Sequence, residues 1–179
     1  MPLYLITGIA GSGKTTTGQA LRELGYTVYD TDLDALAKWQ HKETGYIHPK
    51  SSVKPEQRTA EFLSQHTWNV QRGELETLRT ESGEQIVFIT GNIANLVDVR
   101  DLFEGIYTLY VDNEKLQQRL LERPGPQWGK RPEELEQSLR LNSQAPEKYR
   151  NSNITTIDSI QTPKEIAEKI IAAINKSTD

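Results

Sequence analysis

The stretch GIAGSGKTT, which runs from Gly8 to Thr16, follows the apolar run LYLIT and precedes a segment with helical spacing. Gly8, four further residues, Gly13, Lys14 and a hydroxyl residue form the P-loop pattern. This pattern needs a strand before it and a helix after it, and the sequence predicts both. Repeated glycines let the backbone turn so that its N–H groups point at a phosphate. A glycine-rich turn without a ligand is the alternative, and the flanking elements disfavour it.

The P-loop pattern gives a chemical role to each of its polar residues. We expect Lys14 to reach the terminal phosphates of ATP and the Thr15 hydroxyl to bind Mg²⁺. The following helix directs its positive dipole end at the same anion. The residues expected to bind the nucleotide here are Gly8, Ala10, Gly11, Ser12, Gly13, Lys14, Thr15 and Thr16.

Composition limits the class of protein. The chain has 179 residues, which fits a single domain over 1–179. Its 21 basic and 25 acidic residues give a net charge of −4, so no general affinity for nucleic acid is indicated. It has no cysteine, and no apolar run approaches the ~20 residues that span a membrane. We expect a soluble cytoplasmic protein, and the sequence does not predict its oligomeric state.

Strand-like runs alternate with helical patterns along the chain. This alternation predicts an α/β fold in which a parallel sheet lies between two layers of helices. Ligands of such sheets collect at the carboxyl ends of the strands. The expected strands are Leu3–Thr7, Tyr26–Tyr29, Ile86–Thr90, Ile106–Val111 and Ile154–Ile157.

The connection after the second strand is too long for a plain crossover. Asp30 and Ile86 are separated by 55 residues, so we expect an insertion at about 33–82. Its apolar spacing predicts a helical stretch from about Glu56 to Arg79. An insertion beside a phosphate site is a natural place for a second substrate.

Aromatic residues and histidines gather in this insertion. Trp39 and Trp68 are expected to pack in a core or an interface rather than to serve as a stacking platform. His41, His48 and His66 lack metal-ligand spacing, so no role is assigned to them.

Polar residues follow the second and third strands. Asp30 and Asp32 can divide the tasks of holding Mg²⁺ and orienting an acceptor hydroxyl, and the third strand lacks the acidic residue that many P-loop ATPases carry there. The alternative for Asp32, and still more for Asp34, is as the N-cap of a following helix. Gly91 and Asn92 are candidates for substrate contact, and a tight turn explains them equally well.

The stretch RLLERPGPQWGKRPEEL contains several arginines around a loop rich in Pro and Gly. A mobile loop of this kind at about 123–132 is typical of a lid that closes over a triphosphate. Arg123 and Arg131 would neutralise charge on the transferred group, and Arg123 would also bind the nucleotide. Surface arginines paired with nearby glutamates are the alternative.

Together these stretches resemble the shikimate kinase and nucleoside monophosphate kinase group of P-loop kinases. The resemblance implies a three-layer sandwich with a five-stranded parallel sheet in the order 2-3-1-4-5, a substrate-binding helical region and a lid. It implies Asp30 as the Mg²⁺-associated carboxylate and Asp32 as the acceptor-contacting residue. Arg58 matches the substrate-binding arginine of shikimate kinases, and Arg131 matches their lid arginine. The stretches that carry the resemblance are GIAGSGKTTTGQAL, VYDTD, IVFITG, KRP and IDSIQTPKEIAEKI, in which SIQTP matches the loop near adenine.

One departure concerns the acceptor. Shikimate kinases carry a triple glycine after the third strand, whereas this chain has Gly91 followed by Asn92 and Ile93. The departure argues against shikimate itself as the acceptor.

The sequence therefore predicts an ATP- and Mg²⁺-dependent kinase that phosphorylates a hydroxyl or a monophosphate of an unidentified small molecule. The expected roles are catalytic for Lys14, Asp32, Arg123 and Arg131, substrate-binding for Asp32, Arg58, Gly91 and Asn92, and metal-binding for Thr15 and Asp30. One alternative is a nucleotide-dependent switch or NTPase without a small-molecule acceptor. Another is a kinase for nucleic-acid ends, with a local basic groove made by Lys42, Lys50, Lys54 and Arg58.

Overall fold

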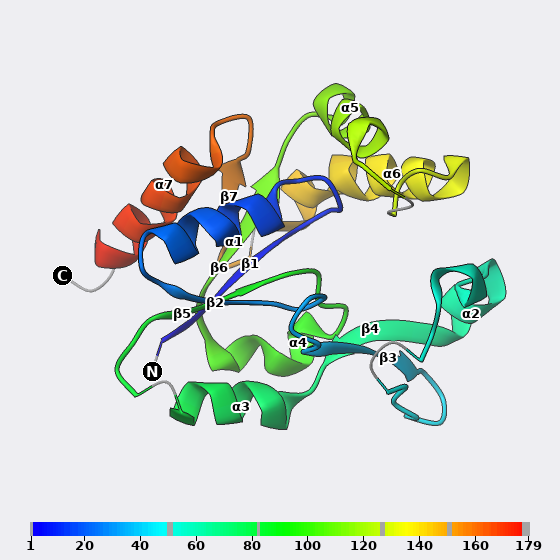
Figure 1. The fold of residues 1–179 in the computed structure, drawn as a ribbon, viewed down its shortest axis with the longest axis horizontal. Coiled ribbons are helices and arrows are strands. Elements are labelled where there is room, and N and C mark those ends of the chain that lie inside the picture. Colours follow the sequence, from blue (N-terminus) through cyan, green and yellow to red (C-terminus); the bar gives the residue numbers. More distant parts are fainter. Residues whose placement is uncertain (1, 50–51, 82, 126–127, 150–151, 177–179) are drawn as a thin grey trace.

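A five-stranded parallel sheet with helices on both faces forms the centre of the molecule (Figure 1). The strand order is β2-β5-β1-β6-β7, which is 2-3-1-4-5 when only the strands of this sheet are counted, so the expected order is confirmed. The computed structural model describes residues 2–49, 52–81, 83–125, 128–149 and 152–176. The strands of the sheet are β1 (Leu3–Gly8), β2 (Thr27–Asp30), β5 (Val87–Thr90), β6 (Phe103–Tyr110) and β7 (Ile154–Asp158).

The central strand β1 is buried on both faces, because its side chains alternate between two layers of helices. Leu3 and Leu5 pack in a core that α3 and α4 complete. Tyr4 and Ile6 pack in the opposite core, which α1 and α7 cover (Figure 1). The expected three-layer arrangement is therefore confirmed. These helices are α1 (Lys14–Glu23), α3 (Arg72–Glu81), α4 (Leu96–Val99) and α7 (Pro163–Lys176).

Two further helices, α5 (Asn113–Glu122) and α6 (Pro132–Tyr149), pack together beside the P-loop. Leu116 and Leu120 of α5 form a small apolar cluster that Ala10 of the P-loop joins. The segment between these helices coincides with the expected lid at about 123–132, of which 126 and 127 lie outside the described residues. No helix in the described ranges has the length and apolar character needed to cross a membrane.

The insertion after β2 differs from the prediction, because it contains an antiparallel pair of strands. β3 (Ala37–His41) pairs with β4 (His66–Val70) in a separate two-stranded sheet (Figure 1). Trp39 and Trp68 stand opposite each other in this pair, and aromatic residues favour strands. The helical stretch expected from about Glu56 to Arg79 is therefore only partly correct, because β4 interrupts it. In its place the chain forms a 3₁₀ turn (Pro55–Gln57), α2 (Ala60–Gln65), β4 and α3.

Gly91 follows β5 at a point where another segment comes very close. Its φ is +153°, and a Cβ at this position would lie 1.8 Å from Oγ1 of Thr31. Thr31 is fully buried, and its N–H donates a hydrogen bond to the Thr90 carbonyl at 2.8 Å. A glycine is therefore required here for the loop after β2 to pack against the end of β5.

We expect Gly91→Ala to lower the free energy of unfolding by about 3 kcal/mol, because the added methyl group clashes with Thr31 and the backbone conformation disfavours an L side chain. Urea unfolding measures the change. Gly73→Ala is the matched control: the methyl group added there on α3 meets no atom within 4 Å, and alanine favours a helix by up to about 1 kcal/mol. A Gly91→Ala variant as stable as the wild type would contradict the close packing.

Candidate active site

The P-loop between β1 and α1 has the conformation that its glycines permit. Gly8, Gly11 and Gly13 have φ values of +143°, +84° and +102°. Gly13 is the N-cap of α1, and no side chain of the described residues caps the first turn of this helix. Unpaired N–H groups at a helix start bind anions. Ser12 instead lies inside the loop, where its side chain is fully buried and its N–H donates to the Ile9 carbonyl at 3.0 Å.

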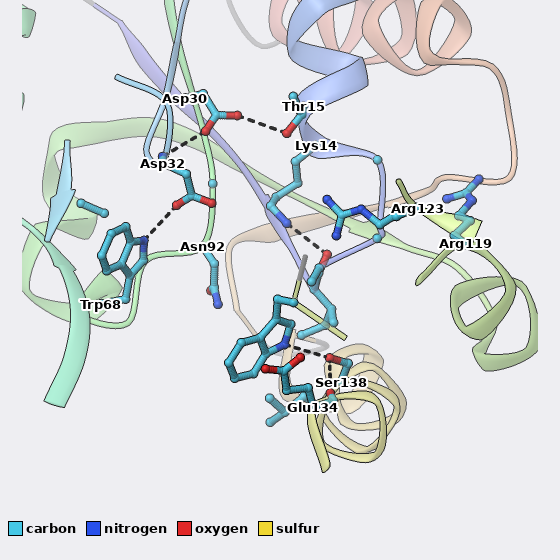
Figure 2. A pocket seen from close by; sticks show the side chains of 18 of the residues that line it. Lys14, Thr15, Asp30, Asp32, Trp68, Asn92, Arg119, Arg123, Glu134 and Ser138 are labelled. Carbon is cyan, nitrogen blue, oxygen red and sulfur yellow. Dashed lines mark hydrogen bonds between the residues drawn. The ribbon is translucent and has the colours of Figure 1, made fainter. Parts of the chain in front are cut away.

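Lys14 folds back over the P-loop. Its Nζ donates hydrogen bonds to the carbonyl oxygens of Gly8 at 2.8 Å and Ile9 at 3.0 Å. Burial lowers the pKa of Lys14 to about 8, the negative charge of Asp32 opposes this shift, and the positive charge of Arg123 adds to it. Lys14, Asp32 and Arg123 therefore lie close enough for their charges to interact, as Figure 2 shows.

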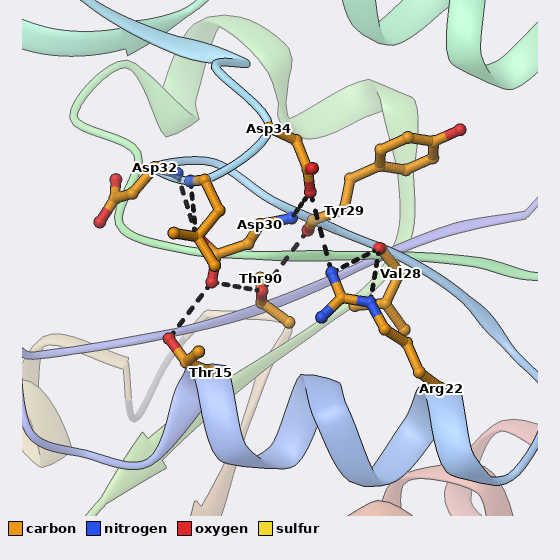
Figure 3. Close-up of polar contacts among 9 residues, drawn as sticks. Thr15, Arg22, Val28, Tyr29, Asp30, Asp32, Asp34 and Thr90 are labelled. Atoms are coloured by element: carbon orange, nitrogen blue, oxygen red, sulfur yellow. Dashed lines mark hydrogen bonds and ion pairs between the residues drawn. The ribbon is translucent and has the colours of Figure 1, made fainter. Parts of the chain in front are cut away.

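The Asp30 carboxylate is buried and fully hydrogen-bonded (Figure 3). Its Oδ2 accepts hydrogen bonds from the hydroxyls of Thr15 at 3.2 Å and Thr90 at 3.3 Å. Its Oδ1 accepts from the backbone N–H groups of Asp32 at 3.0 Å and Leu33 at 3.3 Å. Thr15 and Asp30, the two residues expected to bind Mg²⁺, are therefore hydrogen-bonded to each other.

Asp32 is exposed and faces the P-loop from the loop after β2 (Figure 2). Its Oδ1 accepts hydrogen bonds from Trp68 Nε1 at 3.0 Å and from the Thr31 hydroxyl at 3.3 Å. Burial lowers the pKa of Arg123, and the charge of Asp32 opposes that shift. Asp32 is therefore the acidic group that faces both Lys14 and Arg123.

No helix occurs in the described residues 31–49 that follow β2, so the alternative of Asp32 or Asp34 as a helix N-cap is wrong. The chain turns and enters β3 at Ala37. Asp34 accepts a hydrogen bond from the Asp30 N–H at 2.7 Å and lies 3.8 Å from the Arg22 guanidinium (Figure 3). Its short polar side chain closes the turn that begins at Asp30.

The arginines of α5 and the following segment separate into two groups. Arg119 donates hydrogen bonds to the Ser159 carbonyl at 2.7 Å and to the Ser159 hydroxyl at 3.2 Å, so it binds the loop before α7. Arg123 is half-buried and lies near Lys14 (Figure 2). Arg131 is exposed at the start of α6.

These residues line one cavity of about 1220 Å³. The P-loop forms part of its wall, and β3, β4 and the loop after β5 form another part. Gly8 and Ser12 do not line it, although both were expected at the nucleotide. The expected residues that line the cavity are Ala10, Gly11, Gly13, Lys14, Thr15, Thr16, Asp30, Asp32, Arg58, Gly91, Asn92, Arg123 and Arg131.

Arg58 brings a positive charge to the cavity from the insertion. Its guanidinium carbon lies 5.9 Å from the centre of a Trp39 ring, and one nitrogen donates to the Val53 carbonyl at 3.4 Å. Its Nε is buried and has no hydrogen-bond partner among the described residues. No carboxylate in the described ranges pairs with this guanidinium.

Sequence reasoning did not assign a role to Thr90, Trp68 or Arg119. A signal for Thr90 was available, because it ends β5 opposite Asp30 in the register of the sheet. Trp68 was expected only to pack, and its bond to Asp32 joins residues far apart in the sequence. No local pattern indicates such a bond.

The comparisons with known proteins agree with this fold. A family model described as an AAA domain matches residues 5–140. The chain belongs to this family. No curated protein matches the chain significantly.

Solved structures similar to this AAA-domain chain include several kinases. Shikimate kinase from Acinetobacter baumannii in complex with shikimate is 23% identical, with 99% of this chain and 94% of that chain covered and a TM-score of 0.60. A gluconokinase from Sinorhizobium meliloti 1021 is 17% identical, with 98% and 92% covered and a TM-score of 0.57. A sugar kinase from Janibacter sp. HTCC2649 is 20% identical, with 98% and 95% covered and a TM-score of 0.57. The fold is thus that of the group which the motifs indicated.

We expect Thr90→Val in this AAA-domain chain to lower the free energy of unfolding by about 1–2 kcal/mol, because it removes a donor to the buried Asp30 carboxylate and keeps the side-chain shape. Urea unfolding measures the change. Thr108→Val is the matched control on β6, where an equally buried threonine donates to no carboxylate in the described ranges. We expect a change within about 0.5 kcal/mol there. Equal losses in the two variants would contradict the assigned role of Thr90.

Proposed function

We propose that this protein is an ATP-dependent small-molecule kinase that transfers the γ-phosphate to a hydroxyl or monophosphate acceptor. The observation that carries the proposal is the position of Asp32, which faces Lys14 and Arg123 across one cavity. A P-loop alone binds nucleotide, whereas a carboxylate facing the terminal phosphates from the opposite wall provides a base for an acceptor hydroxyl. The kinase structures that share the fold support this class of reaction.

In this proposal the nucleotide extends from the P-loop towards α7. The phosphates bind the loop amides and Lys14. The nucleobase of ATP lies towards Arg119 and Pro163, which line the same cavity on the side of the loop before α7. That loop contains the stretch SIQTP, and Arg119 holds it through Ser159.

Thr15 and Asp30 fit a Mg²⁺ ion that is shared with the nucleotide. The Thr15 hydroxyl donates its proton to Asp30, so its oxygen lone pairs are available to a cation. Nucleotide-bound Mg²⁺ usually keeps several waters and takes one or two protein ligands, so Thr15 would bind the ion directly and the negative charge of Asp30 beside Thr15 would favour it. When bound, the ion neutralises charge on the β- and γ-phosphates. No group of three or more acidic or histidine side chains suited to a metal occurs in the described ranges.

The transfer step uses residues from both walls of the cavity. The acceptor oxygen attacks the γ-phosphorus, its proton passes to Asp32, and ADP leaves as the bond to the β-γ bridging oxygen breaks. Lys14 and Arg123 stabilise the charge that develops on the phosphate oxygens. Arg131 adds to this stabilisation when the segment 123–132 approaches the nucleotide.

The acceptor contacts Asp32, Asn92 and Arg58 in this proposal. Gly91 lines the cavity beside Asn92, with no side chain to obstruct an acceptor. Arg58 is a guanidinium without a carboxylate partner in the described ranges, on the wall opposite the P-loop. A guanidinium in a cavity binds carboxylate or phosphate strongly. We therefore propose an acceptor that carries an anionic group besides its reacting oxygen.

The two other functions have less support. A switch or plain NTPase does not need the Arg58 guanidinium, which has no carboxylate partner in the described ranges, in the lining of the cavity. A kinase for nucleic-acid ends needs a basic groove, but Lys42 and Lys54 do not line the cavity, and Lys50 lies outside the described residues. A small-molecule kinase fits best in the cytoplasm, where ATP is abundant and a chain without cysteines meets no redox constraint.

The first experiment screens small hydroxyl and monophosphate metabolites with γ-labelled ATP and Mg²⁺, and follows labelled product and free phosphate in parallel. We expect label on one anionic compound. We expect Lys14→Ala to lower this transfer by about 10²–10³-fold, because it removes a charge at the terminal phosphates. Lys169→Ala, an exposed change on α7, is the control for the loss of a lysine. Label found only in free phosphate with every compound would favour the NTPase instead.

We expect Arg58→Gln to raise KM for the acceptor at least tenfold and to leave KM for ATP within twofold, because it removes a charge that only the acceptor contacts. Steady-state kinetics with each substrate varied in turn measures both. Arg140→Gln removes the same charge from an exposed position on α6 outside the cavity and serves as the control. An acceptor without an anionic group, or an unchanged acceptor KM, would contradict the role of Arg58.

A further inference from the structure

A tryptophan of the insertion holds the carboxylate that faces the P-loop. Trp68 Nε1 donates a hydrogen bond to Asp32 Oδ1 at 3.0 Å (Figure 2). The Thr31 hydroxyl bonds the same oxygen at 3.3 Å. The other carboxylate oxygen, Oδ2, accepts no hydrogen bond from the part of the chain that the structure describes. The two oxygens of Asp32 are therefore unequal, and only one is engaged.

Trp68 is itself fixed by the protein rather than by a ligand. Its side chain packs against the core that contains α3 and α4. Its backbone carbonyl accepts a hydrogen bond from the Ala94 N–H at 2.9 Å. Val70, two residues after Trp68, is also held: the Asn95 side-chain amide donates to the Val70 carbonyl at 3.0 Å and accepts from the Val70 N–H at 3.1 Å. The indole N–H thus has a set position before any acceptor arrives.

Asp32 needs such a restraint because two positive groups stand near it. Asp32 interacts electrostatically with both Lys14 and Arg123, and an exposed carboxylate is free to rotate towards either of them. A carboxylate turned to a cation offers its oxygens poorly to an acceptor hydroxyl. A fixed donor on Oδ1 limits this rotation and leaves Oδ2 for the acceptor.

We propose that Trp68 is a positioning residue, whose indole N–H orients the Asp32 carboxylate so that Oδ2 receives the proton of the acceptor hydroxyl. This inference rests on the proposed function, in which Asp32 contacts the acceptor. It assigns to the inserted strand β4 a part in the transfer step in addition to its part in shaping the cavity. Misplacement of a reacting group by about 1 Å can slow a reaction 10²-fold, so one hydrogen bond suffices for a measurable effect.

Trp39 provides a matched control for Trp68. The two residues are opposite each other in the β3–β4 register, and their rings lie 5.1 Å apart between centroids. Both line the cavity. The Trp39 Nε1 is buried without a hydrogen-bond partner among the described residues, whereas the Trp68 Nε1 bonds Asp32. Replacement by Phe therefore shortens an aromatic side chain in both cases, but breaks a bond to Asp32 in only one.

The first arm of the test needs no acceptor. The three tryptophans give three indole N–H signals in a nitrogen–proton NMR spectrum, which Trp→Phe variants assign. We expect Asp32→Ala to move the Trp68 signal upfield, because the bond to a charged oxygen is lost. The signals of Trp39 and of Trp128, which bonds Ser138, stay in place. A Trp68 signal that does not move would overturn the inference.

The second arm measures the consequence for transfer, with the acceptor that the metabolite screen yields. We expect Trp68→Phe to lower kcat about tenfold in the wild-type background and less than twofold in an Asp32→Ala background. We expect Trp39→Phe to have the same effect in both backgrounds. KM for ATP stays within twofold throughout. An equal loss from Trp68→Phe in both backgrounds would assign Trp68 a merely structural role and overturn the inference.

Failure of the proposed function is distinguishable from failure of this inference. A screen that yields no acceptor overturns the proposed function, and the same variants are then compared by the phosphate that they release from ATP to water. If Trp68→Phe slows that hydrolysis in the wild-type background but not in the Asp32→Ala background, Trp68 still positions Asp32, and water is the acceptor. Absence of coupling there overturns the inference as well.

Discussion

The carboxylate of Asp30 joins the parts of the site, and their geometry depends on it. A buried charge must be satisfied by hydrogen bonds, and this one accepts them from three different elements. Thr15 donates from the start of α1, Thr90 from the end of β5, and the N–H of Asp32 from the loop after β2. The P-loop helix, the central sheet and the acidic loop therefore keep fixed relative positions before a nucleotide binds.

A closed path of contacts extends from this carboxylate to the insertion. Asp30 holds the backbone of Asp32, and the side chain of Asp32 accepts from Trp68. The carbonyl of Trp68 accepts from Ala94, which lies in the loop after β5, the strand that ends at Thr90. The path thus returns to the sheet next to its origin. The P-loop side and the β4 side of the cavity are held by one short set of hydrogen bonds, which suits the proposed transfer because it needs both substrates aligned.

Features that depend on residues close together in the sequence could be predicted from it. The P-loop and the five strands follow from local spacing, and the strand order followed from the resemblance to known kinases. The prediction for the insertion was partly wrong, because β3 and β4 pair through residues far apart in the sequence, such as Trp39 and Trp68. The N-cap alternative for Asp34 failed because the segment after its turn is β3, which pairs with the distant β4, and Asp34 instead accepts from the backbone of Asp30. Patterns of single residues carry no information about such pairings.

The two arginines of α5 show how one proline can separate residues that spacing treats alike. Arg119 and Arg123 are four positions apart, so a continuous helix would present both on one face. Pro124 disfavours the helical conformation of the residue before it, and Arg123 has an extended ψ of 138° just after the last residue of the helix. Arg119 stays on the helix and binds Ser159, whereas Arg123 leaves it and lies near Lys14. The end of α5 therefore assigns one arginine to the loop before α7 and the other to the P-loop side of the cavity.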